Sequence, residues 1–164
     1  MVDPENENTV ALREYEASDE HTVVDLGLRA WAPAYDAWRV ILGDSLYTHE
    51  YPDWRASQAA AIRHSTQANH AWVATENGAP VGFVNVVLHD ADRGEIDMLA
   101  VDPARQRTGI GQKLIDYALD FMRTHGVTHA ELGTGGDPGH AAARRAYERA
   151  GFVGLPLVHY YKQL

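Results

Sequence analysis

One short stretch, residues 101–111, constrains this chain more than any other, because two glycines stand where a strand runs into a helix. Apolar residues at 96–101 form the expected strand, and Pro103 ends it because proline cannot donate a ladder hydrogen bond. Gly109 and Gly111 follow, directly before a helical apolar repeat. A glycine-bearing turn that opens a helix exposes backbone N–H groups at the positive end of the helix dipole. The stretch therefore predicts a phosphate site, which we interpret as the site for the pyrophosphate of a nucleotide-like cofactor.

The composition fits a single globular domain. Hydrophobic residues make up 45% of the 164 residues and charged residues 23%, as in folded chains. We expect residues 1–8, which are polar and acidic, to form a flexible tail and residues 9–164 to form one domain. The sequence contains no apolar run near the roughly 20 residues that span a bilayer, and the tail does not resemble a signal peptide, so no membrane partner is expected.

Charge and missing residue types exclude several kinds of chemistry. The absence of cysteine excludes disulfides, thiolate metal sites and a cysteine nucleophile, and it fits a cytoplasmic location. The net charge of −9 argues against binding to nucleic acid, which depends on neutralising phosphates. The nine histidines show no ligand spacing, so no metal site is predicted.

The periodicity of the chain predicts helices followed by a meander and then alternating elements. The expected helices span residues 18–30, 33–43, 53–67, 110–125 and 140–150. The expected strands span residues 9–14, 70–75, 81–88, 95–101 and 128–133, with closing strands at 152–153 and 158–162. Asn77-Gly78 predicts a tight hairpin, and Gly126 predicts the end of the fourth helix. The strand at 128–133 must be parallel to the one at 95–101 if a right-handed crossover joins them.

The glycine turn and its surroundings resemble a known family. Gln106-Arg-Thr-Gly-Ile-Gly111 is similar to the [Arg/Gln]-x-x-Gly-x-[Gly/Ala] turn of the GNAT superfamily of acyl-CoA-dependent N-acetyltransferases. The strand Met98–Val101 and the later pattern Ala143-x-x-x-Tyr147-Glu-x-x-Gly-Phe152 are also similar to that family. The resemblance implies an α/β (α+β) fold: a GNAT-like mixed, mostly antiparallel sheet of six to seven strands with a central splayed parallel pair, flanked by helices. The turn matches neither a P-loop nor the Rossmann spacing.

The resemblance also implies that acetyl-CoA, as co-substrate, lies between the splayed strands. Strand backbone would hold the pantetheine arm, and the turn N–H groups would hold the pyrophosphate, with Lys113 or Arg107 adding positive charge. His140 stands where the family often has an asparagine that contacts the CoA arm; a helix N-cap or a titrating group is the alternative. The predicted cofactor-binding residues are Leu99, Ala100, Val101, Gln106, Arg107, Thr108, Gly109, Ile110, Gly111, Gln112, His140 and Ala143.

Two residues are candidates for the proton transfers. Tyr147 occupies the position where many relatives place a tyrosine near the CoA sulfur, which suggests a general acid; an aromatic side chain that packs the helix is the alternative. Glu95 is the candidate base, because some relatives carry a catalytic glutamate there and a carboxylate in an apolar cleft has a raised pKa. By the period of two, Glu95, Asp97, Leu99 and Val101 would share one strand face. Asp97 is the alternative, as base through water or as an anchor for a cationic substrate, and ordinary solvated charges remain the third interpretation.

The acceptor should bind against the aromatic residues between positions 31 and 54. Tyr35 and Tyr51 are the better candidates for the site, whereas Trp31 and Trp38 suit core packing. We therefore expect transfer of an acetyl group from acetyl-CoA to a primary amine of a small molecule by direct attack in a ternary complex. The alternatives are acetylation of a protein or peptide and a catalytically silent acyl-CoA-binding regulatory domain. A homodimer is expected only by analogy with relatives.

Overall fold

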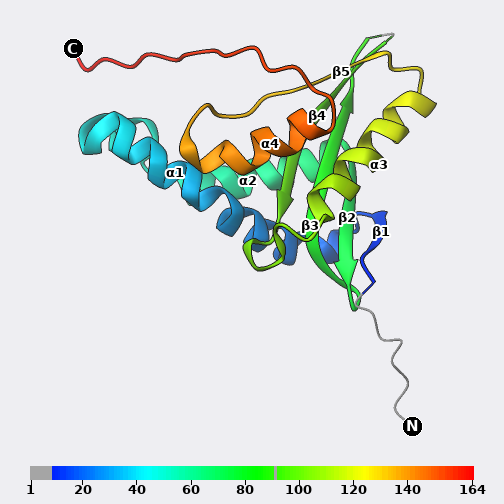
Figure 1. Cartoon of the computed structure of the whole chain (residues 1–164). Coiled ribbons are helices and arrows are strands. Elements are labelled where there is room, and N and C mark those ends of the chain that lie inside the picture. Colours follow the sequence, from blue (N-terminus) through cyan, green and yellow to red (C-terminus); the bar gives the residue numbers. More distant parts are fainter. Residues whose placement is uncertain (1–8, 91) are drawn as a thin grey trace.

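A mixed sheet with helices on both faces forms the centre of the fold (Figure 1). The structure, a computed structural model, describes residues 9–90 and 92–164, so the predicted tail at 1–8 lies outside the described residues. In the described residues the sheet has five strands in sequence order: β1 (Ala11–Glu14), β2 (His70–Glu76), β3 (Ala79–Leu88), β4 (Arg93–Val101) and β5 (His129–Leu132). Neighbours are antiparallel except β4 and β5, which are parallel. The predicted parallel pair is confirmed.

The predicted number of six to seven strands is wrong, because the closing strands do not form in the described chain. Gly151 adopts a left-handed φ of 92° after the last helix, and Gly154 and Pro156 then interrupt any regular strand. The final residues run back over the last helix toward the far end of the first one, away from β5 (Figure 1). Almost all of them are exposed.

The first two helices, α1 (Glu20–Glu50) and α2 (Trp54–Ala68), cover one face of the sheet. The two helices predicted between residues 18 and 43 are one continuous helix in the structure, because α1 continues through Pro33. Its interruption lies at Gly43, the residue predicted to end the second of those helices, where φ is 74° and ψ is 161°. The Asp53 carboxylate caps α2 by accepting from the Ala56 N–H at 3.0 Å, as N-cap residues do.

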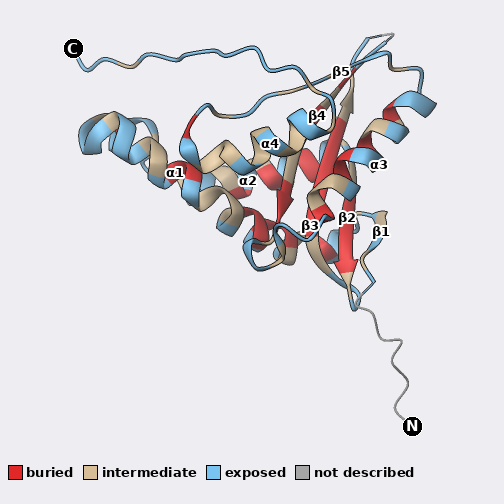
Figure 2. Cartoon of the chain, in the orientation of Figure 1, coloured by how far each residue is buried: buried red, intermediate tan, exposed pale blue. Residues whose placement is uncertain are grey.

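The last two helices, α3 (Ile110–Thr124) and α4 (Ala141–Arg149), lie on the other face. Leu114, Ile115 and Met122 bury one side of α3 against the sheet. Gly126 follows α3 with a φ of 81°, which confirms the predicted helix end. Figure 2 shows that the buried residues concentrate on the strands and on the helix sides that face them.

The turn between β2 and β3 is the predicted tight hairpin. Asn77 and Gly78 both have positive φ, 50° and 82°, as a type I′ turn requires. Successive side chains of β3 point to opposite faces of the sheet. Phe83 packs under α1 and α2, whereas Val84 and Val86 pack under α3. No helix of the described chain has the length and apolar character needed to cross a bilayer.

Candidate active site

The parallel strands separate at the level of Ile96. Residues 93–96 of β4 pair with residues 129–132 of β5, and β4 then continues to Val101. Beyond Ile96, β4 has no strand partner on its β5 side in the described part of the chain. The gap opens toward the glycine turn, so an extended molecule lying along residues 97–101 would reach from the turn to the point where the strands separate.

A bulge in β4 changes which side chains share a face. Asn85 of β3 lies opposite Met98 and the next residue lies opposite Ile96, so Asp97 is the extra residue. Asp97 contacts Ser65 on α2, whereas Leu99 and Val101 pack into the core under α3. The predicted common face of Glu95, Asp97, Leu99 and Val101 is therefore wrong: the two carboxylates face α1 and α2, and the two apolar side chains face α3. Strict alternation fails because one inserted residue shifts the phase of the strand.

The glycine turn presents a helix N-terminus without a side-chain cap. Gly109 is the N-cap of α3 with a left-handed φ of 88°, and no side chain caps the helix. Gln106 Nε2 donates to the Val101 carbonyl at 3.2 Å and Thr108 Oγ1 donates to the Arg105 carbonyl at 2.6 Å, which fix the shape of the turn. Because the first turn of α3 contains no acidic residue, the helix dipole is free to attract an anion.

The predicted cofactor-binding residues lie on this turn, on β4, at the start of α3 and near the start of α4. Residues 106–109 are exposed, Gly111 and Gln112 are half-buried, and Ile110 is buried in the core. Ala143 and His140 are half-buried near the start of α4. An added Cβ at Gly111 would meet only Val101 at 3.7 Å among the described residues, so packing within the chain does not require glycine there.

Asp97 is held by a polar network that the sequence analysis missed. Ser65 Oγ donates to the Asp97 carboxylate, and Asn69 Nδ2 approaches the same oxygen at 3.4 Å. Asn85, which is fully buried, donates from Nδ2 to Ser65 Oγ at 2.8 Å. Its Oδ1 has no partner among the described residues. An asparagine inside the apolar run of β3 was the one sequence signal for this network, because a buried amide needs partners.

Glu95 lies in a different set of ion pairs. His89 Nε2 is 3.0 Å from Glu95 Oε2, and Glu131 faces Glu95 across the parallel pair. In the described chain, His89, Glu95 and Glu131 offer three possible ligand atoms within 4.8 Å of one another. Arg93 already neutralises Glu131 at 2.7 Å, and all of these side chains are partly exposed. The arrangement is that of a surface ion-pair network, so we do not propose a metal there.

Tyr147 lies on α4 and packs against the core under α3. Its ring meets Phe152 edge-on with centroids 6.2 Å apart, and it joins the cluster that contains Leu99 and Leu132. Burial raises the pKa of the Tyr147 phenol above its usual value. The phenol is therefore protonated at neutral pH, as a proton donor must be.

His140 is tied to the first helix. Its Nδ1 lies 2.7 Å from Asp137 Oδ2, and its ring stacks on Trp38 with centroids 5.9 Å apart. Trp38 Nε1 donates to the same carboxylate oxygen at 2.9 Å. Burial alone would raise the pKa of Asp137, but the hydrogen bonds from His140 and Trp38 outweigh it and lower that pKa. Asp137, which the sequence analysis did not select, thus joins the loop after β5 to α1.

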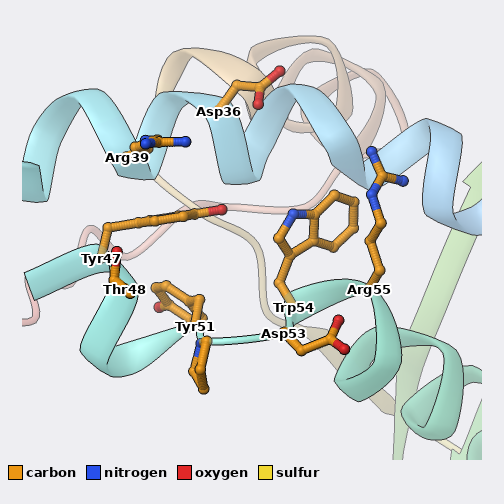
Figure 3. A pocket seen from close by; sticks show the side chains of 9 residues that line it. Asp36, Arg39, Tyr47, Thr48, Tyr51, Asp53, Trp54 and Arg55 are labelled. Atoms are coloured by element: carbon orange, nitrogen blue, oxygen red, sulfur yellow. The ribbon is translucent and has the colours of Figure 1, made fainter. Parts of the chain in front are cut away.

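The predicted aromatic wall is a stacked cluster between α1 and α2. Tyr35 stacks on Trp54 at 4.1 Å and meets Trp38 and Tyr51 edge-on. Tyr35 is buried and its hydroxyl donates to Gln58 Oε1 at 3.1 Å, so Tyr35 lies inside the cluster. Tyr51 instead lines an open hollow of about 320 Å³. Figure 3 shows this hollow between the end of α1 and the start of α2, with Asp36, Arg39, Tyr47, Thr48, Tyr51, Asp53, Trp54 and Arg55 around it.

The hollow and the carboxylates lie toward opposite ends of α2. Trp54 begins the helix and Ser65, which holds Asp97, lies eleven residues later. At 1.5 Å per residue this separation is about 16 Å. Tyr51 and Asp97 therefore cannot contact the same small functional group, although one extended acceptor could reach both.

Comparison with known proteins assigns the class of this fold and site. Residues 31–152 match the acetyltransferase (GNAT) family. A mycothiol acetyltransferase from Beutenbergia cavernae is 33% identical over 136 residues, which cover 83% of this chain and 42% of the relative. The ribosomal-protein-S18-alanine N-acetyltransferase from Escherichia coli superposes with a TM-score of 0.65 at 21% identity, covering 90% of this chain and 80% of that one. A GNAT acetyltransferase from Brucella melitensis in complex with acetyl-CoA gives 0.60 at 19% identity, over 90% and 84%.

The chain thus belongs to the GNAT acetyltransferase family. The chain spans less than half of the length of the curated relatives it matches.

Proposed function

We propose that the chain transfers an acetyl group from acetyl-CoA to a primary amine of a small molecule by direct attack in a ternary complex. The observation that carries this proposal is the separation of β4 from β5 beyond Ile96, next to the uncapped start of α3. In the proposed complex the pyrophosphate lies on the turn at Gln106–Gly111 and the pantetheine arm lies along Leu99 to Val101. The thioester then reaches the end of the β4–β5 pairing, close to the carboxylates of β4.

The acceptor amine arrives as an ammonium, because its pKa is about 10, and it must lose a proton before attack. Asp97 is fixed by Ser65 and Asn69, whereas Glu95 is engaged by His89. Both carboxylates face α1 and α2, so the acceptor approaches from that side of the sheet. We favour Asp97 as the group that binds the ammonium and Glu95 as the base that receives the proton, either directly or through water.

The amine nitrogen then forms a bond to the thioester carbon, and the carbon–sulfur bond breaks. The departing CoA thiolate takes a proton from the Tyr147 hydroxyl, whose raised pKa keeps it protonated until then. The nitrogen, which is positively charged after the attack, loses its second proton through water to the Tyr147 phenolate, so the products are the amide and CoA thiol. Because the chain has no cysteine, no cysteinyl acyl-enzyme can form. Direct transfer therefore needs only the two substrates and these side chains.

Two observations favour a small acceptor over a peptide. The relatives at about 33% identity are named mycothiol acetyltransferase, a name that refers to a small molecule. The aromatic cluster of Tyr35, Trp38, Tyr51 and Trp54 also fills the space between α1 and α2. A peptide would need an open groove on the face that these helices cover.

A thiol-release assay with acetyl-CoA and a panel of primary amines and peptides tests the proposal. We expect turnover with at least one small amine and an intersecting-line pattern when both substrates are varied. A ping-pong pattern would contradict direct attack, and turnover confined to peptides would favour a protein acceptor. Binding of acetyl-CoA by calorimetry without turnover on any acceptor would support a silent domain.

A further inference from the structure

Two hydrogen-bond donors face each other across the hollow between α1 and α2. Tyr47 is only 8% exposed, and its hydroxyl points across the hollow toward Trp54, whose Nε1 points back into the same space (Figure 3). Neither group makes a hydrogen bond to a described residue. A phenol keeps its proton at neutral pH, so both groups can donate. Mostly buried tyrosine and tryptophan side chains usually find a partner for their polar group, and the open hollow is where that partner can lie.

Each of these two rings also carries an arginine on its face. The guanidinium carbon of Arg55 lies 4.5 Å from the centroid of the Trp54 ring, and that of Arg39 lies 5.8 Å from the centroid of the Tyr47 ring. Arg39 Nε donates to Asp44 at 2.7 Å, whereas Arg55 makes no ion pair within the described chain. Arginine binds a carboxylate or a phosphate with two parallel N–H groups, and Arg55 is free to do so.

The acidic side chains of the hollow do not occupy its centre. Asp36 and Asp53 line it, but their carboxylates point away from the space between Tyr47 and Trp54 (Figure 3). Asp53 Oδ1 already accepts from the Ala56 N–H at 3.0 Å. The hollow therefore offers two neutral donors and an unpaired cation, which suit a group that carries negative charge and accepts hydrogen bonds. An ammonium group would meet no carboxylate between the two rings.

We propose that this hollow binds an anionic group at the far end of the acceptor, a carboxylate or a phosphate. The inference rests on the proposed function, because it takes the amine of the same acceptor to lie at Asp97. Trp54 and Ser65, which holds Asp97, are roughly 16 Å apart along α2, so the acceptor is an extended molecule with an amine at one end and an anion at the other. The opposite charges of its two ends allow one orientation, with the amine at the end of the β4–β5 pairing.

The indole N–H resonances of the full chain test the proposal without relying on turnover. The chain has four tryptophans, and Trp54→Phe assigns the resonance of Trp54. Titration with ω-aminododecanoic acid should shift this resonance to saturation, and the neutral amide of the same compound should bind about tenfold more weakly. Propionate, which has the carboxylate without the amine, should shift the same resonance with a higher Kd. The absence of a saturable shift with ω-aminododecanoic acid overturns the proposal, and so does an equal Kd for its amide.

Two variants and a control separate the two ends of the acceptor. Arg55→Gln should weaken the binding of ω-aminododecanoic acid about tenfold and remove its advantage over the amide. Asp97→Asn should weaken the binding of the amino acid and leave that of propionate unchanged. Arg123→Gln, which removes an exposed cation near the end of α3, should change neither. If Asp97→Asn leaves the Kd of the amino acid unchanged, the hollow binds free anions instead of the acceptor, and the proposal is overturned.

The thiol-release assay distinguishes failure of this inference from failure of the proposed function. Turnover of small neutral amines without any preference for ω-aminododecanoic acid over its amide refutes the anion site and leaves acetyl transfer standing. Conversely, a saturable Trp54 shift that depends on Asp97, together with no thiol release from any amine, contradicts the proposed function and still supports a site with two charged ends.

Discussion

Replacing Gly109 or Gly111 of the glycine turn by alanine should have different effects, because only Gly109 has a left-handed backbone. Gly109 has a φ of 88°, and nothing described lies within 4 Å of an added Cβ, so alanine there is strained without a clash. Left-handed backbone costs a residue with a Cβ about 1–2 kcal/mol. A loss of about 1 kcal/mol lowers the Tm of a chain of this length by roughly 2–4 °C.

Gly111→Ala should leave the Tm unchanged or slightly higher, because alanine favours the first turn of α3 and the added Cβ meets Val101 at an ordinary 3.7 Å. Acetyl-CoA affinity should nevertheless fall, since the added methyl group holds the phosphate away from the backbone N–H groups. A hydrogen bond to a charged group contributes about 1.5–3 kcal/mol, so losing one raises the Kd roughly 10- to 100-fold.

Gly126→Ala is the matched control for strain. Gly126 has a φ of 81° at the opposite end of α3 and also has nothing described within 4 Å of an added Cβ. It should lower the Tm as Gly109→Ala does and leave the Kd unchanged. Thermal unfolding and calorimetric titration with acetyl-CoA measure both quantities. An unchanged Kd in Gly111→Ala, or equal weakening in Gly126→Ala and Gly109→Ala, would refute the assignment of the pyrophosphate to this turn.

Three further predictions concern side chains. Tyr147→Phe should lower kcat by about 100-fold while the Kd for acetyl-CoA changes less than twofold, and an unaltered kcat removes Tyr147 from the chemistry. Ser65→Ala should raise the KM for the amine acceptor several-fold, because it removes the hydrogen bond that holds Asp97, and it should leave the Kd for acetyl-CoA unchanged. Equal effects on both substrates in steady-state kinetics would show that the network is only structural. Hydrogen bonds from Arg13 hold the pKa of Asp19 below its usual value, so ionised Asp19 stabilises the folded state. This contribution to the unfolding free energy is complete above about pH 4 and is lost as pH falls through the lower pKa of the folded state. Asp19→Asn should therefore flatten the unfolding free energy between neutral and acid pH, and a variant with the natural pH profile would show that Asp19 carries none of the dependence.

The sequence predicted those turns and helix ends that depend on residues close together in the chain. The hairpin at Asn77-Gly78, the start of α2 near Asp53 and the end of α3 at Gly126 each depend on residues close together in sequence, and the structure contains all three. The glycine turn was also identifiable, because a strand, a glycine and a helix start lie within fifteen residues. These features need no knowledge of distant contacts.

The features that the sequence did not predict depend on contacts between distant segments. The bulge at Asp97 arises where β4 meets Asn85 of β3 and Ser65 of α2, and no pattern within β4 indicates it. The absence of closing strands has a similar cause. Residues 158–162 favour a strand by composition, but a strand forms only where another strand lies beside it, and the chain leaves α4 in a different direction.

The inserted residue of β4 gives the strand two independent halves. Before Asp97, residues 93–96 pair with β5, and after it β4 has no strand partner on that side in the described chain, although Ile96, Leu99 and Val101 all pack under α3. Deleting Asp97 would restore regular alternation and leave Leu99 and Val101 in the α3 core, because Ile96 and Met98 already face opposite sides of the sheet. Substitutions on either side likewise leave the other half in phase. We therefore expect substitutions at residues 93–97 to change acceptor preference without disturbing residues 99–101, the surface that we propose holds the donor.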